Sequence, residues 1–101
     1  MWVCLDLLRS LPRKERVSGA GELLKTLWLS GRNAAPAVRA FVGGGEVSSR
    51  LLREIKACLA FKARVVVADP LDKKRIRERL NYGHTVGHAL ESLAGGRLTH
   101  G

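Results

Sequence analysis

The feature that most constrains the fold is the segment 48–67, where apolar side chains recur at three- and four-residue steps. The positions that share this spacing are Leu51, Leu52, Ile55, Cys58, Leu59 and Phe61. Such spacing matches the period of an α-helix and not the two-residue alternation of a half-buried strand. Ser48 or Ser49 can begin the helix, and Asp69-Pro70 disfavours helical geometry at its end. The β-branched run 65–67 would suit a strand, but it continues the helical pattern, and we expect it to form the last helical turn.

Shorter segments before this helix also favour helical structure. Residues 1–11 form an apolar segment that Pro12 stops, and 12–16 is a charged segment that suits a first helical turn. We expect Ser18-Gly19-Ala20-Gly21 to interrupt the helical structure, and a helix to follow over 22–29. A short helix is expected over 37–42, before Gly43-Gly44-Gly45. The sequence therefore predicts a mainly α fold.

Composition limits the size of the protein and the kind of partner it can bind. The chain has 101 residues, of which 46% are hydrophobic and 27% are charged. This length allows one domain at most, and the composition is ordinary for a globular protein. The net charge of +9 suits a partner rich in phosphate or carboxylate groups. Nucleic acid is the general form of that inference, and a small anionic substrate is the specific form. The five aromatic residues argue against an aromatic nucleic-acid platform.

The two cysteines and the apolar segments bear on the compartment. Cys4 and Cys58 are far apart and show no metal-ligand spacing, which favours a reducing, cytoplasmic location. No apolar run approaches the roughly 20 residues that span a bilayer. The N-terminal apolar residues are broken at once by Asp6, unlike the core of a signal peptide. We therefore expect no membrane association.

All three histidines lie in the C-terminal fifth of the chain, at positions 84, 88 and 100. If the chain is helical from Thr85 onward, His84 and His88 share one face, which by spacing alone favours them as a metal-binding pair. A chance surface pair remains the alternative at this point. Gly87 costs a helix about 1 kcal/mol relative to alanine, so we expect another group to approach its backbone closely. Gly95-Gly96 predicts a left-handed cap, after which the chain turns to present His100.

These residues also carry a resemblance. The run Leu80-Asn81-Tyr82-Gly83-His84-Thr85-Val86-Gly87-His88-Ala89-Leu90-Glu91, followed by His100-Gly101, resembles a signature of the 3-dehydroquinate synthase family. The Leu11-Pro12 pair with the Gly-x-x-Glu-x-x-Lys pattern of 19–25 is similar to a second family block, although Thr26-Leu27 replaces its usual aromatic-glycine pair. A third block runs from Lys62 to Asp69 and leads, with one residue more than the usual spacing, to Arg77.

The resemblance implies a set of site residues. Glu22, His84 and His100 would hold the metal, Zn²⁺ or Co²⁺, which leaves His88 for substrate phosphate. On this point the resemblance and the spacing disagree, and we follow the resemblance. The residues implied in substrate binding are Lys25, Lys62, Arg77, Asn81 and His88, of which His88 and Lys25 would also be catalytic.

The resemblance further implies an activity. The family converts 3-deoxy-D-arabino-heptulosonate 7-phosphate to 3-dehydroquinate and phosphate, with bound NAD, in the shikimate pathway of aromatic amino acid biosynthesis. We expect residues 1–101 to be part of the C-terminal metal- and substrate-binding domain of such a two-domain enzyme, without the nucleotide-binding α/β domain. The 101-residue chain alone is then expected to be inactive, whether it is a short protein or an incomplete gene product, and the complete enzyme to be a homodimer.

Three alternatives stay open at this stage. Two are enzymes of the same architecture, either another sugar-phosphate cyclase or a metal-dependent polyol dehydrogenase. The step from Arg77 to Asn81 before Gly83-His84 favours the cyclases. The third is an inactive basic fragment that binds nucleic acid, which rests on net charge alone and would show a steep dependence of affinity on salt.

Overall fold

The structure is a computed structural model, and it describes residues 4–44, 47–95 and 97–98. Within these ranges every regular element is helical and there is no strand, which confirms the prediction of a mainly α fold for this part of the chain. The elements are α1 (Asp6–Arg9), α2 (Arg13–Leu29), α3 (Ala35–Val42), α4 (Ser49–Ala68), the 3-10 helix η1 (Ile76–Asn81) and α5 (His84–Leu93). In the described ranges, no helix combines the length and apolar content needed to cross a membrane.

Helix α4 is the long helix predicted from the apolar spacing. The Ser48 side chain accepts a hydrogen bond from the backbone N–H of Leu51 at 3.2 Å. This hydrogen bond caps the first turn. The valine run at the other end is helical, with Val65 buried, so its assignment to the last turns of the helix is confirmed. Asp69 is the C-cap residue, as expected for a residue directly before proline.

The predicted interruption at 18–21 is wrong. Helix α2 runs without a break through both glycines, and Pro12 is its N-cap residue. An interior glycine costs a helix about 1 kcal/mol, but tertiary packing contributes more than intrinsic propensity to most helices in proteins. Ala20, Thr26 and Leu27 of α2 are all buried. Packing against α3 and α4 therefore keeps the segment helical.

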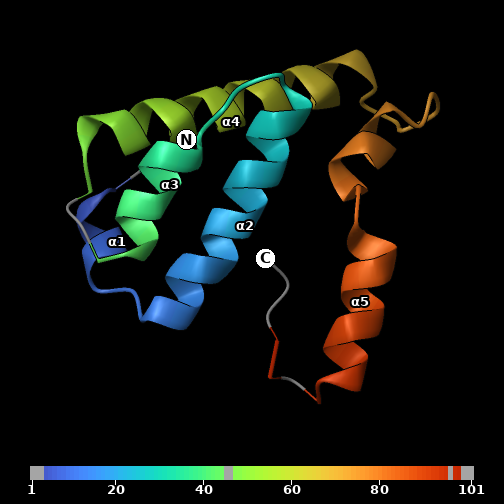
Figure 1. The fold of residues 1–101 in the computed structure, drawn as a ribbon. Coiled ribbons are helices and arrows are strands. Elements are labelled where there is room, and N and C mark those ends of the chain that lie inside the picture. Colours follow the sequence, from blue (N-terminus) through green and yellow to red (C-terminus); the bar gives the residue numbers. More distant parts are fainter. Residues whose placement is uncertain (1–3, 45–46, 96, 99–101) are drawn as a thin grey trace.

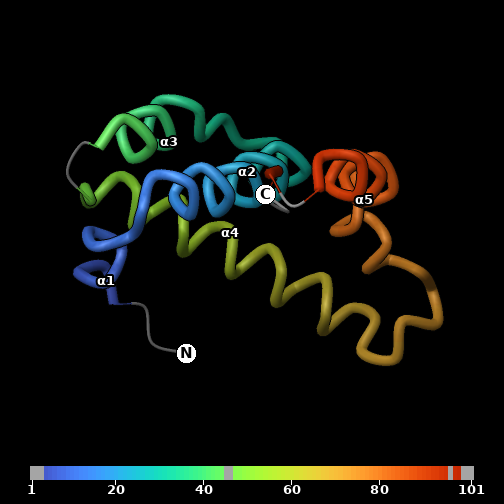
Figure 2. Tube along the Cα trace, turned by 90° about the horizontal axis from the view of Figure 1, so that it is seen from below, coloured from blue at the N-terminus to red at the C-terminus, as the bar shows by residue number. Residues whose placement is uncertain are grey.

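The core is formed by α2, α3 and α4 (Figure 1). In the view of Figure 2, α4 crosses on one side while α2 and α3 lie together on the other. The buried apolar residues that form one cluster between them are Ala20, Leu27, Ala34, Val38 and Cys58. Burying apolar surface stabilises by about 25 cal/mol per Å². This three-helix core fixes the positions of Glu22, Lys25 and Lys62, which lie on α2 and α4.

The remaining two elements, η1 and α5, form what we call the C-terminal arm. The arm begins where η1 packs against α4, and α5 then lies to one side of the three-helix core (Figure 1), beside the end of α2 in the view of Figure 2. Neither η1 nor α5 contains a buried residue. Val86, Leu90 and Leu93 of α5 are 65%, 50% and 84% exposed. The arm is therefore held by the packing of η1 on α4 and by Tyr82, which lies near Trp28 at the end of α2.

Two glycines set the limits of α5. Gly83 precedes the helix with a φ of +83°, and Gly95 follows the C-cap residue Ala94 with a φ of +55°. Both values lie in the left-handed region, which glycine adopts at the lowest cost. The predicted left-handed cap is thus confirmed at Gly95, while Gly96 and His100 lie outside the described residues.

Candidate functional site

The three-helix core and the arm meet at a pocket of about 220 Å³. The residues that line it are Gly21, Glu22 and Lys25 from α2, with Tyr82, Gly83, His84 and Gly87 from the arm. Two of the three predicted metal ligands, Glu22 and His84, therefore share one pocket, although they are far apart in sequence. The same pocket is lined by Lys25, which is predicted to bind substrate and to be catalytic.

Glu22 is held between two lysines. Lys25, one turn further along α2, donates a hydrogen bond from Nζ to Glu22 Oε1 at 2.6 Å. Lys62 approaches from α4, with its Nζ 3.8 Å from Glu22 Oε2. The Lys25 side chain is 19% exposed and that of Glu22 is 34% exposed. The pair is therefore more enclosed than a typical surface ion pair. Both predicted lysines thus lie beside the predicted metal carboxylate.

The surroundings of Glu22 favour its ionised form. Partial burial raises the pKa of Glu22, but the hydrogen bond from Lys25 and the positive charges of Lys25, Lys62 and His84 together outweigh it. The pKa of Glu22 therefore lies below its ordinary value. A carboxylate that is deprotonated at neutral pH is the form that can bind a metal ion or a lysine.

The two histidines of α5 lie as the four-residue spacing predicts. Their ring centroids are 5.5 Å apart, with the ring planes at 80° in an edge-to-face arrangement. His84 is half-buried and lines the pocket, whereas His88, one turn further on, is exposed. The shared face is confirmed, and the structure places His84 and not His88 beside Glu22.

The expectation that another group approaches Gly87 is wrong for the described residues. A Cβ atom built on Gly87 would meet no atom within 4 Å among them. Gly87 borders the pocket shared by Glu22 and His84 instead. The absence of a side chain at this position leaves more space in the pocket.

The other predicted substrate-binding residues lie outside the pocket lining. Arg77 and Asn81 are both on η1, where Arg77 is half-buried and Asn81 is exposed. The structure therefore brings together Glu22, Lys25 and His84, with Lys62 reaching the same carboxylate. It leaves Arg77, Asn81 and His88 on other parts of the arm.

Zinc accepts both carboxylate oxygen and imidazole nitrogen. The donor chemistry of Glu22 and His84, together in one pocket, fits such an ion. The third predicted ligand, His100, lies outside the described residues. Among the residues that are described, no three His, Cys, Asp or Glu side chains are grouped closely enough to hold a metal. The three-residue metal site remains a prediction.

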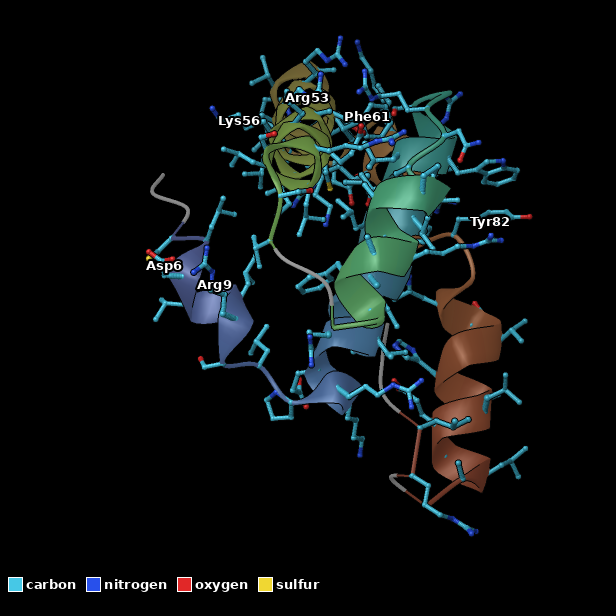
Figure 3. All side chains as sticks on the ribbon, turned by 60° about the vertical axis from the view of Figure 1, so that its left-hand side comes forward. Asp6, Arg9, Arg53, Lys56, Phe61 and Tyr82 are labelled. Atoms are coloured by element: carbon cyan, nitrogen blue, oxygen red, sulfur yellow. The ribbon has the colours of Figure 1, made fainter. Side chains whose placement is uncertain are left out.

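Several residues around this pocket have no role predicted from the sequence. Tyr82 lines it and also lies near Trp28, with ring centroids 6.4 Å apart and planes at 46°. Figure 3 shows Tyr82 projecting outward between η1 and α5, and it is 64% exposed. The two aromatic rings border a larger open pocket of about 850 Å³ that also includes Leu24 and Lys25. No helical spacing connects Trp28 to Tyr82, so only the fold brings the two rings together.

The structure thus shows a helical domain that brings a carboxylate, a lysine and a histidine side chain together in one pocket. The profile of the family described as 3-dehydroquinate synthase C-terminal matches residues 19–101. The chain belongs to this family. The resemblance seen in the sequence is thereby confirmed.

Relatives named 3-dehydroquinate synthase match almost the whole chain. Those from Latilactobacillus sakei, Pseudarthrobacter chlorophenolicus and Chlamydia abortus are 37%, 41% and 39% identical over 96, 103 and 106 residues. The matches cover 95%, 96% and 100% of this chain but 27% of each relative. The chain thus spans about a quarter of the length of the curated relatives it matches. No solved structure gives a significant match.

Proposed function

We propose that this chain supplies the metal- and substrate-binding part of a 3-dehydroquinate synthase, a lyase of the shikimate pathway. The reaction converts 3-deoxy-D-arabino-heptulosonate 7-phosphate to 3-dehydroquinate and phosphate. One observation carries the proposal: Glu22 and Lys25 of α2 share a pocket with His84 of α5. The names of the relatives support the same activity.

The proposal assigns the metal to Glu22, His84 and His100. Zn²⁺ or Co²⁺ bound there would supply Lewis-acid stabilisation of negative charge on a substrate oxygen. Glu22 is suited to this role because its lowered pKa keeps it anionic. Lys25 Nζ holds a proton at Glu22 Oε1 and can turn that donor toward a substrate hydroxyl beside the metal.

The substrate carries anionic groups at both ends, which gives the basic residues outside the pocket their roles. Arg77, with the two-pronged donor geometry of guanidinium, and Lys62 would bind the carboxylate. Asn81 and the exposed His88 would donate hydrogen bonds to the phosphate. None of these side chains belongs to the pocket lining. The proposal therefore assigns them to the two charged ends of a substrate whose hydroxyls enter the pocket.

The proposal extends to the whole enzyme. We propose that the complete enzyme is a cytoplasmic homodimer and that residues 1–101 belong to its C-terminal domain. The described residues form only helices and connecting turns, so they do not fit the strand-to-helix phosphate loop that binds NAD. We therefore derive no step through NAD from this chain.

A binding experiment with the 101-residue chain tests the proposal. We expect titration with the sugar phosphate, in the presence of zinc, to shift the NMR signals of Lys25, Arg77 and His88. Arg77→Lys should weaken binding about tenfold, because lysine cannot reproduce the two parallel hydrogen bonds. Arg53→Lys, on the exposed outer side of α4 (Figure 3), is the matched control and should leave affinity unchanged. Absence of binding by the unsubstituted chain would contradict the proposal.

A further inference from the structure

The turn between α4 and η1 is organised around one buried carboxylate. Asp69, only 4% exposed, accepts hydrogen bonds from three backbone N–H groups. Lys73 donates to Oδ1 at 2.9 Å, Lys74 to Oδ2 at 2.9 Å and Ile76 to Oδ2 at 3.3 Å. The Asp69 carbonyl oxygen also accepts from the N–H of Asp72 at 3.1 Å. A single residue therefore fixes the path of the whole turn.

Burial makes these hydrogen bonds necessary. A carboxylate removed from water is costly unless donors satisfy its oxygens. The turn also contains two non-glycine residues in the left-handed region, Asp72 with a φ of +55° and Arg75 with a φ of +54°. Such conformations persist only where the surrounding structure holds them. The three hydrogen bonds that the Asp69 carboxylate accepts provide that constraint.

The last of these donors connects the turn to the site. Ile76 is the first residue of η1, and Arg77 follows it directly. Asn81 is the last residue of the same short helix, and the segment after it leads to Gly83 and His84. Because η1 has no buried residue of its own, its orientation depends on how its first turn is attached to α4.

We propose that Asp69 is a positioning residue for substrate binding, which acts by holding the start of η1 so that Arg77 and Asn81 face the substrate. This inference rests on the proposed function, since it takes Arg77 and Asn81 as the residues that bind the carboxylate and the phosphate. Asp69 itself does not touch the substrate. Its hydrogen bonds place the residues that do.

The test compares Asp69→Asn with Asp72→Asn in the 101-residue chain. Asparagine at 69 keeps one oxygen acceptor but turns an NH₂ group toward backbone N–H donors, so one or two of the three bonds are lost. Asp72 is exposed in the same turn, and its side chain is outside this set of bonds, which makes it the matched control. Affinity for 3-deoxy-D-arabino-heptulosonate 7-phosphate, the Arg77 Nε–H NMR signal and amide exchange would be measured.

We expect Asp69→Asn to weaken substrate binding about tenfold, because charged hydrogen bonds that hold the start of η1 are lost and η1 must then be ordered when the substrate binds. The substrate-induced shift of the Arg77 signal should shrink, and the amides of Lys73 and Ile76 should exchange faster. The Leu27 amide in the three-helix core should exchange as before. Asp72→Asn should change the affinity by no more than about twofold, as for an ordinary surface substitution.

Other outcomes would overturn the inference in distinguishable ways. Equal substrate affinity for Asp69→Asn and the unsubstituted chain would contradict it while leaving the proposed function intact. Faster exchange at Leu27 together with the loss of binding would assign Asp69 to the stability of the whole chain and not to positioning. No binding by the unsubstituted chain would contradict the proposed function, and this inference with it.

Discussion

Helices α2, α3 and α4 bury residues in a shared core, whereas η1 and α5 of the arm bury none. The candidate site is divided between the two regions, because Glu22 and Lys25 belong to the core and His84 to the arm. The core can therefore form its half of the site from its own packing energy. The arm reaches its half through the Asp69 turn and the contacts at the pocket. A site of this kind should bind its ligands more tightly when the arm is already held in place.

The largest expected contrast is between core and arm leucines. Leu27 is fully buried in the core, and Leu27→Ala should destabilise the chain by about 3 kcal/mol. Leu90 of α5 is 50% exposed. Because little of its packing would be lost, Leu90→Ala should cost only about 0.5 kcal/mol. Urea unfolding of both variants measures the difference. Equal losses would show that α5 is as firmly packed as the core, and the comparison would fail.

The three histidines should differ in their effect on metal affinity. We expect His84→Ala and His100→Ala to weaken zinc binding by about 100-fold or more, since even outer-shell substitutions cost about 10- to 100-fold. His88→Ala should retain zinc and weaken substrate binding, because His88 is exposed beyond the pocket. Calorimetric titration of the three variants provides the measurement. If His88→Ala lost zinc while His100→Ala kept it, the i,i+4 pair would be the metal site after all.

A smaller effect is expected at two helical glycines, one in each region. A Cβ added at Gly19 or at Gly87 meets no described atom within 4 Å. Gly19→Ala should raise stability by about 0.5–1 kcal/mol, because alanine loses less conformational entropy in a helix. Gly87→Ala should stabilise α5 by a similar amount but weaken substrate binding, since Gly87 borders the pocket. Thermal unfolding and substrate titration of both variants test this; unchanged binding in Gly87→Ala would remove Gly87 from the site.

The smallest expected effect concerns acid stability and Glu22. Its pKa is lowered in the folded chain from an ordinary value of 4.5, so its ionised contacts stabilise the chain fully above about that pH. The stabilisation is lost as pH falls through the lower folded-state pKa. The effect is modest because the side chain is about one-third exposed and solvent screens it. The difference in melting temperature between the unsubstituted chain and Glu22→Gln should therefore shrink in acid; a constant difference would argue against the ionised contacts.

The sequence predicted those features of the fold that depend on interactions between residues close together in the chain. The apolar period of α4, its Ser48 cap and the left-handed Gly95 depend on neighbouring residues, and each was predictable. The continuity of α2 through Gly19 and Gly21 was not, because packing against α3 and α4 overrides the low helix propensity of glycine. The meeting of Glu22 with His84 depends on where the chain places α5 after the Asp69 turn. Spacing carries no information on that placement, and only the family resemblance pointed to it.

If the proposed site is correct, a metal ion joins the arm to the core through Glu22. Amide hydrogen exchange of the 101-residue chain would be followed with and without zinc. We expect zinc to slow exchange across α5 and to leave Val38 in α3 unchanged. In Glu22→Gln, zinc should no longer affect α5. Glu15→Gln, at an exposed position on the same helix α2, should respond to zinc as the unsubstituted chain does. Exchange in α5 that is indifferent to zinc, or that slows equally in Glu22→Gln, would contradict the proposed site.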